Sequence, residues 1–128
     1  MKYLIMIAMF VSYSASSEEL KCKNTKEQTY SSCISTHFEN VKLQVDNKYN
    51  GILARISKVS MLKELTSNLE KSHKNWGGQA DSDCDSYAYF VEKNTPVYQD
   101  IYLQCKYNIY NDRLDYYNKF SDMINDFM

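Results

Sequence analysis

Acidic residues at alternating positions form the most suggestive chemical pattern in this chain. Asp81, Asp83 and Asp85 occupy positions one, three and five of a segment whose twelfth residue is Glu92. EF-hand calcium loops place oxygen ligands at these positions and close the cage with a bidentate Glu. Their sixth residue is a glycine that permits a sharp turn, whereas Ser86 stands there in this chain. The pattern therefore fits either a calcium site or, as we favour, an acidic helix start, where negative charge is stabilised.

Cysteine and histidine are the other residue types that could bind a metal or carry out nucleophilic catalysis. They are Cys22, Cys33, Cys84, Cys105, His37 and His73. A zinc site or a Cys–His nucleophile pair requires free thiols, and we expect these thiols to be consumed in disulfides. The sequence also contains no glycine-rich phosphate loop. It therefore predicts no catalytic residue, no cofactor and no enzyme.

Tyrosine is concentrated in the second half of the chain, where eight of the twelve tyrosines lie between Tyr87 and Tyr117. We favour a structural interpretation, in which the rings fill a narrow core and the hydroxyls reach water. The alternative is a tyrosine-rich contact surface, because tyrosine is enriched at protein interfaces. The candidate partner-binding residues are Asp81, Asp83, Asp85, Tyr89, Tyr107 and Tyr110.

Composition indicates what kind of fold positions these residues. The chain has 128 residues, of which 44% are hydrophobic and 24% charged, and it contains only three Gly and one Pro. Sandwiches and barrels need a turn signal about every ten residues, so the shortage of Gly and Pro excludes an all-β fold. The net charge of −1, with acids and bases interspersed, argues against nucleic-acid binding.

Apolar residues spaced three or four apart predict the first long helix. They run from Ile34 to Val59, and Thr25 with Gln28 offers a capping box ahead of them. A second stripe runs from Leu62 to Val91. It keeps its phase across the Gly77-Gly78 pair, where we expect a kink or a break because each glycine costs about 1 kcal/mol in a helix interior.

The third helix is predicted to begin at Pro96, with Thr95 as its N-cap. Its apolar stripe consists of Val97, Ile101, Cys105, Ile109, Arg113 (or Asp112), Tyr116, Phe120, Ile124 and Phe127. Three amphipathic helices joined by short turns predict an all-α antiparallel bundle.

The turn between the second and third helices also predicts the disulfide pairing. Cys84 and Cys105 are equidistant from it, and residues equidistant from the turn of an antiparallel hairpin lie level with each other. Both cysteines also lie on their apolar stripes. We therefore expect a Cys84–Cys105 bridge, which leaves Cys22 to pair with Cys33.

Residues 1–16 have the features of a signal peptide. Lys2 precedes an apolar run from Tyr3 to Val11, and small residues follow at 12–16. The run is too short to span a hydrocarbon core of about 30 Å. We therefore expect one mature domain at 17–128, without a membrane span and with a net charge of −2, exported to the periplasm or secreted.

Three groups of residues follow one another along the chain. The upstream motif is Cys22, Thr25, Gln28, Cys33, Val45, Asp46 and Tyr49; the central motif is Leu69, Ser72, His73, Trp76, Asp81 and Cys84; and the downstream motif is Cys105, Ile109 and Arg113. Their order and spacing resemble the LprI-like family of small exported bacterial proteins, named for lysozyme inhibition. The chain departs from the family where Ala80 replaces Arg, His73 replaces Gln and Asp46 replaces Asn.

The resemblance implies export, a helical fold, a bridge between Cys84 and Cys105, and a protein as the partner, with lysozyme as the family's named target. The leading hypothesis is therefore an exported, disulfide-stapled binding protein similar to a lysozyme inhibitor. Two alternatives stay open: a calcium-binding module using an EF-hand-like loop at 81–92, and an envelope structural protein without a catalytic role.

Overall fold

The computed structural model describes residue 22 and residues 29–128, and this part of the chain contains helices and no strand. The helices are α1 (Tyr30–Ile56), a short 3-10 helix η1 (Ser60–Leu62), α2 (Lys63–Tyr87) and α3 (Pro96–Phe127). The predicted all-α fold with three long helices is confirmed. The predicted signal peptide and the Thr25 capping box lie outside the described residues.

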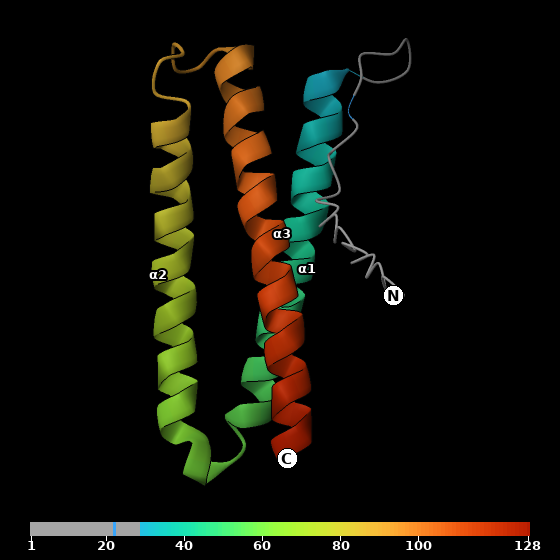
Figure 1. Ribbon diagram of the computed structural model, residues 1–128, viewed down its shortest axis with the longest axis vertical. Helices are drawn as coiled ribbons and strands as arrows, with labels where there is room; N and C mark the ends of the chain where they lie inside the picture. The colour runs from blue at the N-terminus through green and yellow to red at the C-terminus, as the bar shows by residue number, and fades with distance from the viewer. Residues whose placement is uncertain (1–21, 23–28) are drawn as a thin grey trace, which may run out of the picture.

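The three long helices form an up-down-up bundle in which α2 runs opposite to α1 and α3 (Figure 1). The bundle is asymmetric, because α3 packs most extensively against α1, less against α2, and α1 and α2 touch each other least. One core cluster draws side chains from all three helices. No helix among the described residues is long and apolar enough to cross a membrane.

Threonine caps fix where α1 and α3 begin. The Thr29 hydroxyl accepts a hydrogen bond from the Ser32 backbone N–H at 3.1 Å, so α1 begins four residues after the predicted capping box. The Thr95 hydroxyl accepts from the Tyr98 backbone N–H at 3.2 Å, and Pro96 is the first helical residue. This second helix start agrees with the prediction.

Helix α2 is shorter than its apolar stripe predicted, and it is not split. It ends at Tyr87 rather than continuing to Val91, and it passes through Gly77 and Gly78 without interruption. Trp76 packs against the core, and Ala80, one turn later, is buried on the same side of the helix. Gly77 and Gly78 therefore lie between two residues that anchor α2 to the core.

Both disulfides form as predicted. Cys22 is bonded to Cys33 with a Cα–Cα separation of 5.7 Å, and Cys84 is bonded to Cys105 with a separation of 5.6 Å. The first ties residue 22 to the opening of α1, and the second joins α2 to α3 close to their turn. On the chain-entropy model, each contributes on the order of 3 kcal/mol to stability.

The buried face of α3 differs from the predicted stripe. The buried residues are Tyr98, Lys106, Tyr110, Tyr117, Ser121 and Ile124. Val97, Tyr116 and Phe127 from the predicted stripe are exposed. The reason is that α3 packs against both α1 and α2, so its buried face shares only Ile124 with the predicted stripe. Tyr110 and Tyr117, which are absent from the predicted stripe, are core residues, as the structural interpretation of the tyrosines predicts.

Candidate binding surface

Residues from all three sequence motifs converge in the middle of the bundle. Leu69 and Trp76 project from α2, Tyr49 from α1 and Arg113 from α3. Leu69 is buried, while Tyr49 and Trp76 pack against the same core cluster. These four residues, predicted from the motif alone, are thus brought together by the fold.

A histidine links the three helices at this point. The ring of His73 stacks on Tyr49 with 3.7 Å between ring centroids, and its Nδ1 shares a 2.6 Å hydrogen bond with the Tyr117 hydroxyl. Burial lowers the pKa of His73, the nearby Arg113 charge lowers it further, and Asp46 opposes them. The same burial raises the pKa of Tyr117. The neutral pair therefore joins α1, α2 and α3, which is a structural role.

Arg113 is held among aromatic rings. Its guanidinium carbon lies 5.1 Å from the ring centroid of Trp76, 4.6 Å from Tyr116 and 4.7 Å from Tyr117. Its Nη2 also donates a hydrogen bond to the Ser72 hydroxyl at 3.1 Å. Cation–π contacts of this kind stabilise by about 0.5–2 kcal/mol, so Arg113 fastens α3 to α2.

Asp81, a predicted partner-binding residue, forms an ion pair with Lys106. The Lys106 side chain is only 7% exposed, whereas that of Asp81 is 59% exposed. The ammonium of Lys106 also lies between 5.2 and 5.8 Å from the rings of Phe38, Tyr102 and Tyr110. Burial, followed by the charge of Asp81, raises the pKa of Tyr102 to about 12. Sequence reasoning missed Lys106, although it follows Cys105 and is spaced four residues from Tyr102 and Tyr110.

The EF-hand-like alternative is wrong, because Asp81, Asp83 and Asp85 lie within helix α2. The favoured interpretation, an acidic helix start, is also wrong, because these residues lie near the C-terminal end of α2. Alternate residues on a helix point in nearly opposite directions, so Asp83 points away from Asp81 and Asp85, and the three carboxylates do not converge on one ion. Each has its own partner within the protein. Asp83 accepts from the Gln79 side-chain amide at 2.7 Å, and Asp85 accepts from the Tyr98 hydroxyl. Glu92 lies beyond the end of the helix.

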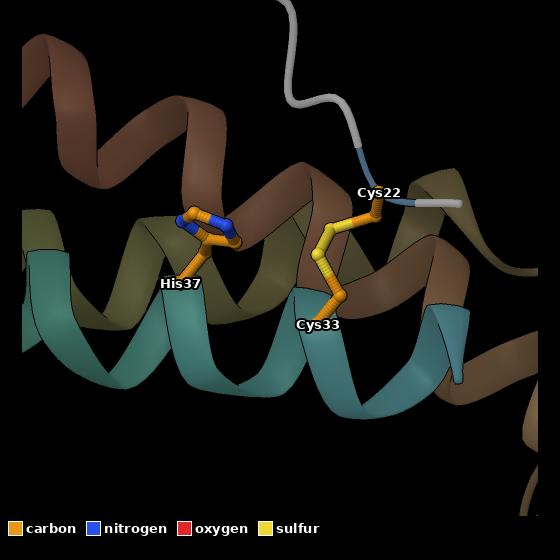
Figure 2. A group of neighbouring side chains, drawn as sticks. All are labelled: Cys22, Cys33 and His37. Carbon is orange, nitrogen blue, oxygen red and sulfur yellow. A yellow bond between two sulfur atoms is a disulfide. The ribbon is translucent and has the colours of Figure 1, made fainter. Parts of the chain in front are cut away.

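One group of three potential metal ligands lies close together within the described part of the chain. Cys22, Cys33 and His37 place their ligand atoms within 4.8 Å of one another. Figure 2 shows why this is not a thiolate site: the two sulfur atoms are bonded to each other, and His37 stands one helical turn along α1. A disulfide offers no thiolate for a metal.

Several exposed aromatic residues lie close together at the turn between α2 and α3, which we call the hairpin tip (residues 87–95). Tyr87, Tyr89 and Phe90 are all exposed, and the Phe90 side chain is almost entirely so, at 97%. Tyr89 and Phe90 pack edge to face with 5.4 Å between their centroids. This is the clearest aromatic surface feature of the described bundle.

The candidate partner-binding residues divide according to their place in the bundle. Asp83, Asp85 and Tyr89 are exposed at or beside the hairpin tip. Tyr110 is buried and cannot contact a partner, so that prediction is wrong. Tyr107 is half-buried and lies edge-on to His37.

Comparison with known proteins gave one finding. The family model described as "Lysozyme inhibitor LprI" matches residues 22–116. No curated protein and no solved structure matches the chain.

Proposed function

This chain belongs to the LprI family, and from that premise we propose that it is an exported inhibitor that binds a lysozyme by protein–protein contact. The observation that carries the proposal is the family match, which spans residues 22–116 and so includes both disulfides and all three long helices, the last of them in part.

The use of side chains in the bundle supports a binding role rather than catalysis. In the described part of the chain, several polar groups with perturbed pKa values join helices to one another, as His73 does with Tyr117 and Tyr102 with Asp81. Such pairs stabilise the bundle, and their partners are other residues of the same chain. An inhibitor that acts by contact requires a stable surface and no reactive group.

The disulfides support the proposed export. All four cysteines are paired, and disulfides persist in oxidising compartments such as the periplasm or the outside medium. Charge supports the proposed partner. Lysozymes are commonly basic, whereas this chain carries a net charge of −1 and loses one more positive charge if residues 1–16 are removed.

The proposal is tested with oxidised residues 17–128 and a purified basic lysozyme. We expect slower lysis of a bacterial cell-wall suspension and slower cleavage of a soluble chitin oligosaccharide. The soluble substrate is the control, because a protein that merely coats cell walls would protect only the suspension. Absence of inhibition of both substrates at tens of micromolar would contradict the proposal and favour a structural role in the envelope.

A further inference from the structure

We propose that the inhibitor contacts the enzyme through the hairpin tip, with Tyr87, Tyr89 and Phe90 as its apolar centre. This inference rests on the proposed function and assigns to it a surface and a chemistry of recognition. The partner it fits is a basic protein whose surface offers an apolar pocket beside cationic side chains.

The first support is the exposure of large rings at a place where the bundle does not need them. Tyr89 is 73% exposed and Phe90 97% exposed, and these rings contact each other rather than the core. Clustered exposed apolar side chains mark interaction sites in folded proteins. Aromatic anchors of this kind supply much of the binding energy of protein interfaces.

The second support is that the hairpin tip is held in one conformation before a partner arrives. The Ala88 N–H donates to the Cys84 carbonyl at 3.1 Å, and the Val91 N–H donates to the Ala88 carbonyl at 3.0 Å. Ala88 is buried, and the Cys84–Cys105 bridge closes the hairpin beneath it. A preorganised surface loses less conformational entropy on binding, so more of the contact energy appears as affinity.

The third support is the sign of the charge around the rings. Asp83, Asp85 and Glu92 are exposed beside them, and Lys93 is the one cation in the hairpin tip. An acidic rim around an aromatic centre steers a cationic partner towards it and disfavours acidic proteins and nucleic acids.

A hollow next to the rings supplies the fourth support. It has a volume of about 350 Å³ and is lined in part by Tyr87, Val97 and Asp100. The Oδ1 atom of Asp100 is buried and has no hydrogen-bond partner among the described residues. A Lys or Arg side chain of the partner that enters the hollow would place a cation beside the Asp100 carboxylate that lines it.

Two positions away from the hairpin tip provide matched controls. Phe127 is 85% exposed at the other end of α3, so it resembles Phe90 in residue type and exposure. Asp112 lines a different hollow, together with Trp76 and Arg113, and serves as the control for Asp100.

The experiment compares inhibition constants for the soluble substrate, with far-ultraviolet circular dichroism to verify folding. We expect the double variant Tyr89→Ala/Phe90→Ala to weaken inhibition by about 30-fold or more, the effect typical of interface hot spots. Asp100→Asn is expected to weaken inhibition about tenfold, because a charge-assisted hydrogen bond would become a neutral one. Phe127→Ala and Asp112→Asn are expected to inhibit as the unmodified protein does.

The outcomes distinguish this inference from the proposed function. If the unmodified protein inhibits and the folded Tyr89→Ala/Phe90→Ala variant inhibits equally well, the inference is overturned and the proposed function stands. An effect of Phe127→Ala as large as that of the double variant also overturns it. If the unmodified protein does not inhibit at all, both are overturned.

Discussion

The ion pair between Asp81 and Lys106 predicts that its two partners respond very differently to substitution. Lys106 is almost completely buried in a ring of aromatic side chains, and Asp81 is the carboxylate that pairs with it. Removing Asp81 leaves a buried ammonium without a counter-charge. Removing the charge of Lys106 leaves only a carboxylate that water already reaches.

The exposures of the two side chains determine the magnitude. Breaking a fully buried pair costs about 3–5 kcal/mol, whereas exposed pairs are worth at most about 1 kcal/mol. Because Lys106 is 7% exposed and Asp81 59% exposed, we expect the Asp81→Ala change to lower the free energy of unfolding by about 1–3 kcal/mol. In a domain of this size that is a fall in Tm of roughly 5–15 °C. Lys106→Met, which keeps the apolar stem, is expected to be neutral or stabilising.

The assay is thermal and urea unfolding of the oxidised protein, followed by far-ultraviolet circular dichroism. The double variant Asp81→Ala/Lys106→Met is expected to recover most of the stability lost in Asp81→Ala. Asp115→Ala is the control, because Asp115 and Lys119 form an exposed pair on α3 and its loss is expected to leave Tm nearly unchanged. The reasoning is refuted if Lys106→Met destabilises as much as Asp81→Ala does, or if Asp81→Ala has no effect.

Two further predictions concern the middle of the bundle. Because the pKa of His73 is lowered in the folded state, the unfolded chain binds a proton at this residue more readily than the folded chain does. The contribution of His73 to the free energy of unfolding is therefore fully present above about pH 6.5 and is lost as the pH drops towards the folded pKa. Urea unfolding between pH 7.5 and pH 5 measures this pH dependence, and His73→Gln should make the free energy of unfolding vary less with pH. A pH profile unchanged by that substitution would contradict the prediction. Arg113→Lys is expected to lower the free energy of unfolding by about 1 kcal/mol, because an ammonium lacks the planar face that stacks on rings. The fluorescence of Trp76, the single tryptophan, is expected to change with it, and an unaltered spectrum and stability would show that the stacking contributes nothing.

The sequence predicted elements well where a helix faces one neighbour or where a local signal fixes a boundary. Helix α1 buries Ile34, Phe38, Val41, Val45, Ile52 and Ile56, all members of its predicted stripe. Thr95 and Pro96 begin α3 as predicted, since capping depends on adjacent residues. The bridge between Cys84 and Cys105 followed from the symmetry of the hairpin about that start.

Prediction failed where the position of a residue depends on the tertiary arrangement. Periodicity gave α3 one apolar face, but packing against two helices buries Tyr110 and Tyr117. Lys106 could not be assigned to the core from its residue type, because its burial depends on Asp81 on another helix. The apolar stripe placed the acidic residues 81–85 in a helix, but the sequence did not show that they lie near the end of α2 rather than at a helix start.

The residues that match the family motifs lie in a different part of the bundle from the residues proposed to contact a partner. Tyr49, Leu69, Trp76 and Arg113 contribute to the joined interior of the bundle, and Cys84 closes the hairpin. Substitutions there act first on stability, through packing and the cation–π contacts. Residues 88–92 lie beyond the end of α2 on the far side of that disulfide, so the exposed rings of Tyr89 and Phe90 can change without disturbing the core. The family match therefore identifies the scaffold, and the choice of partner is expected to depend on the hairpin tip that the scaffold holds in place.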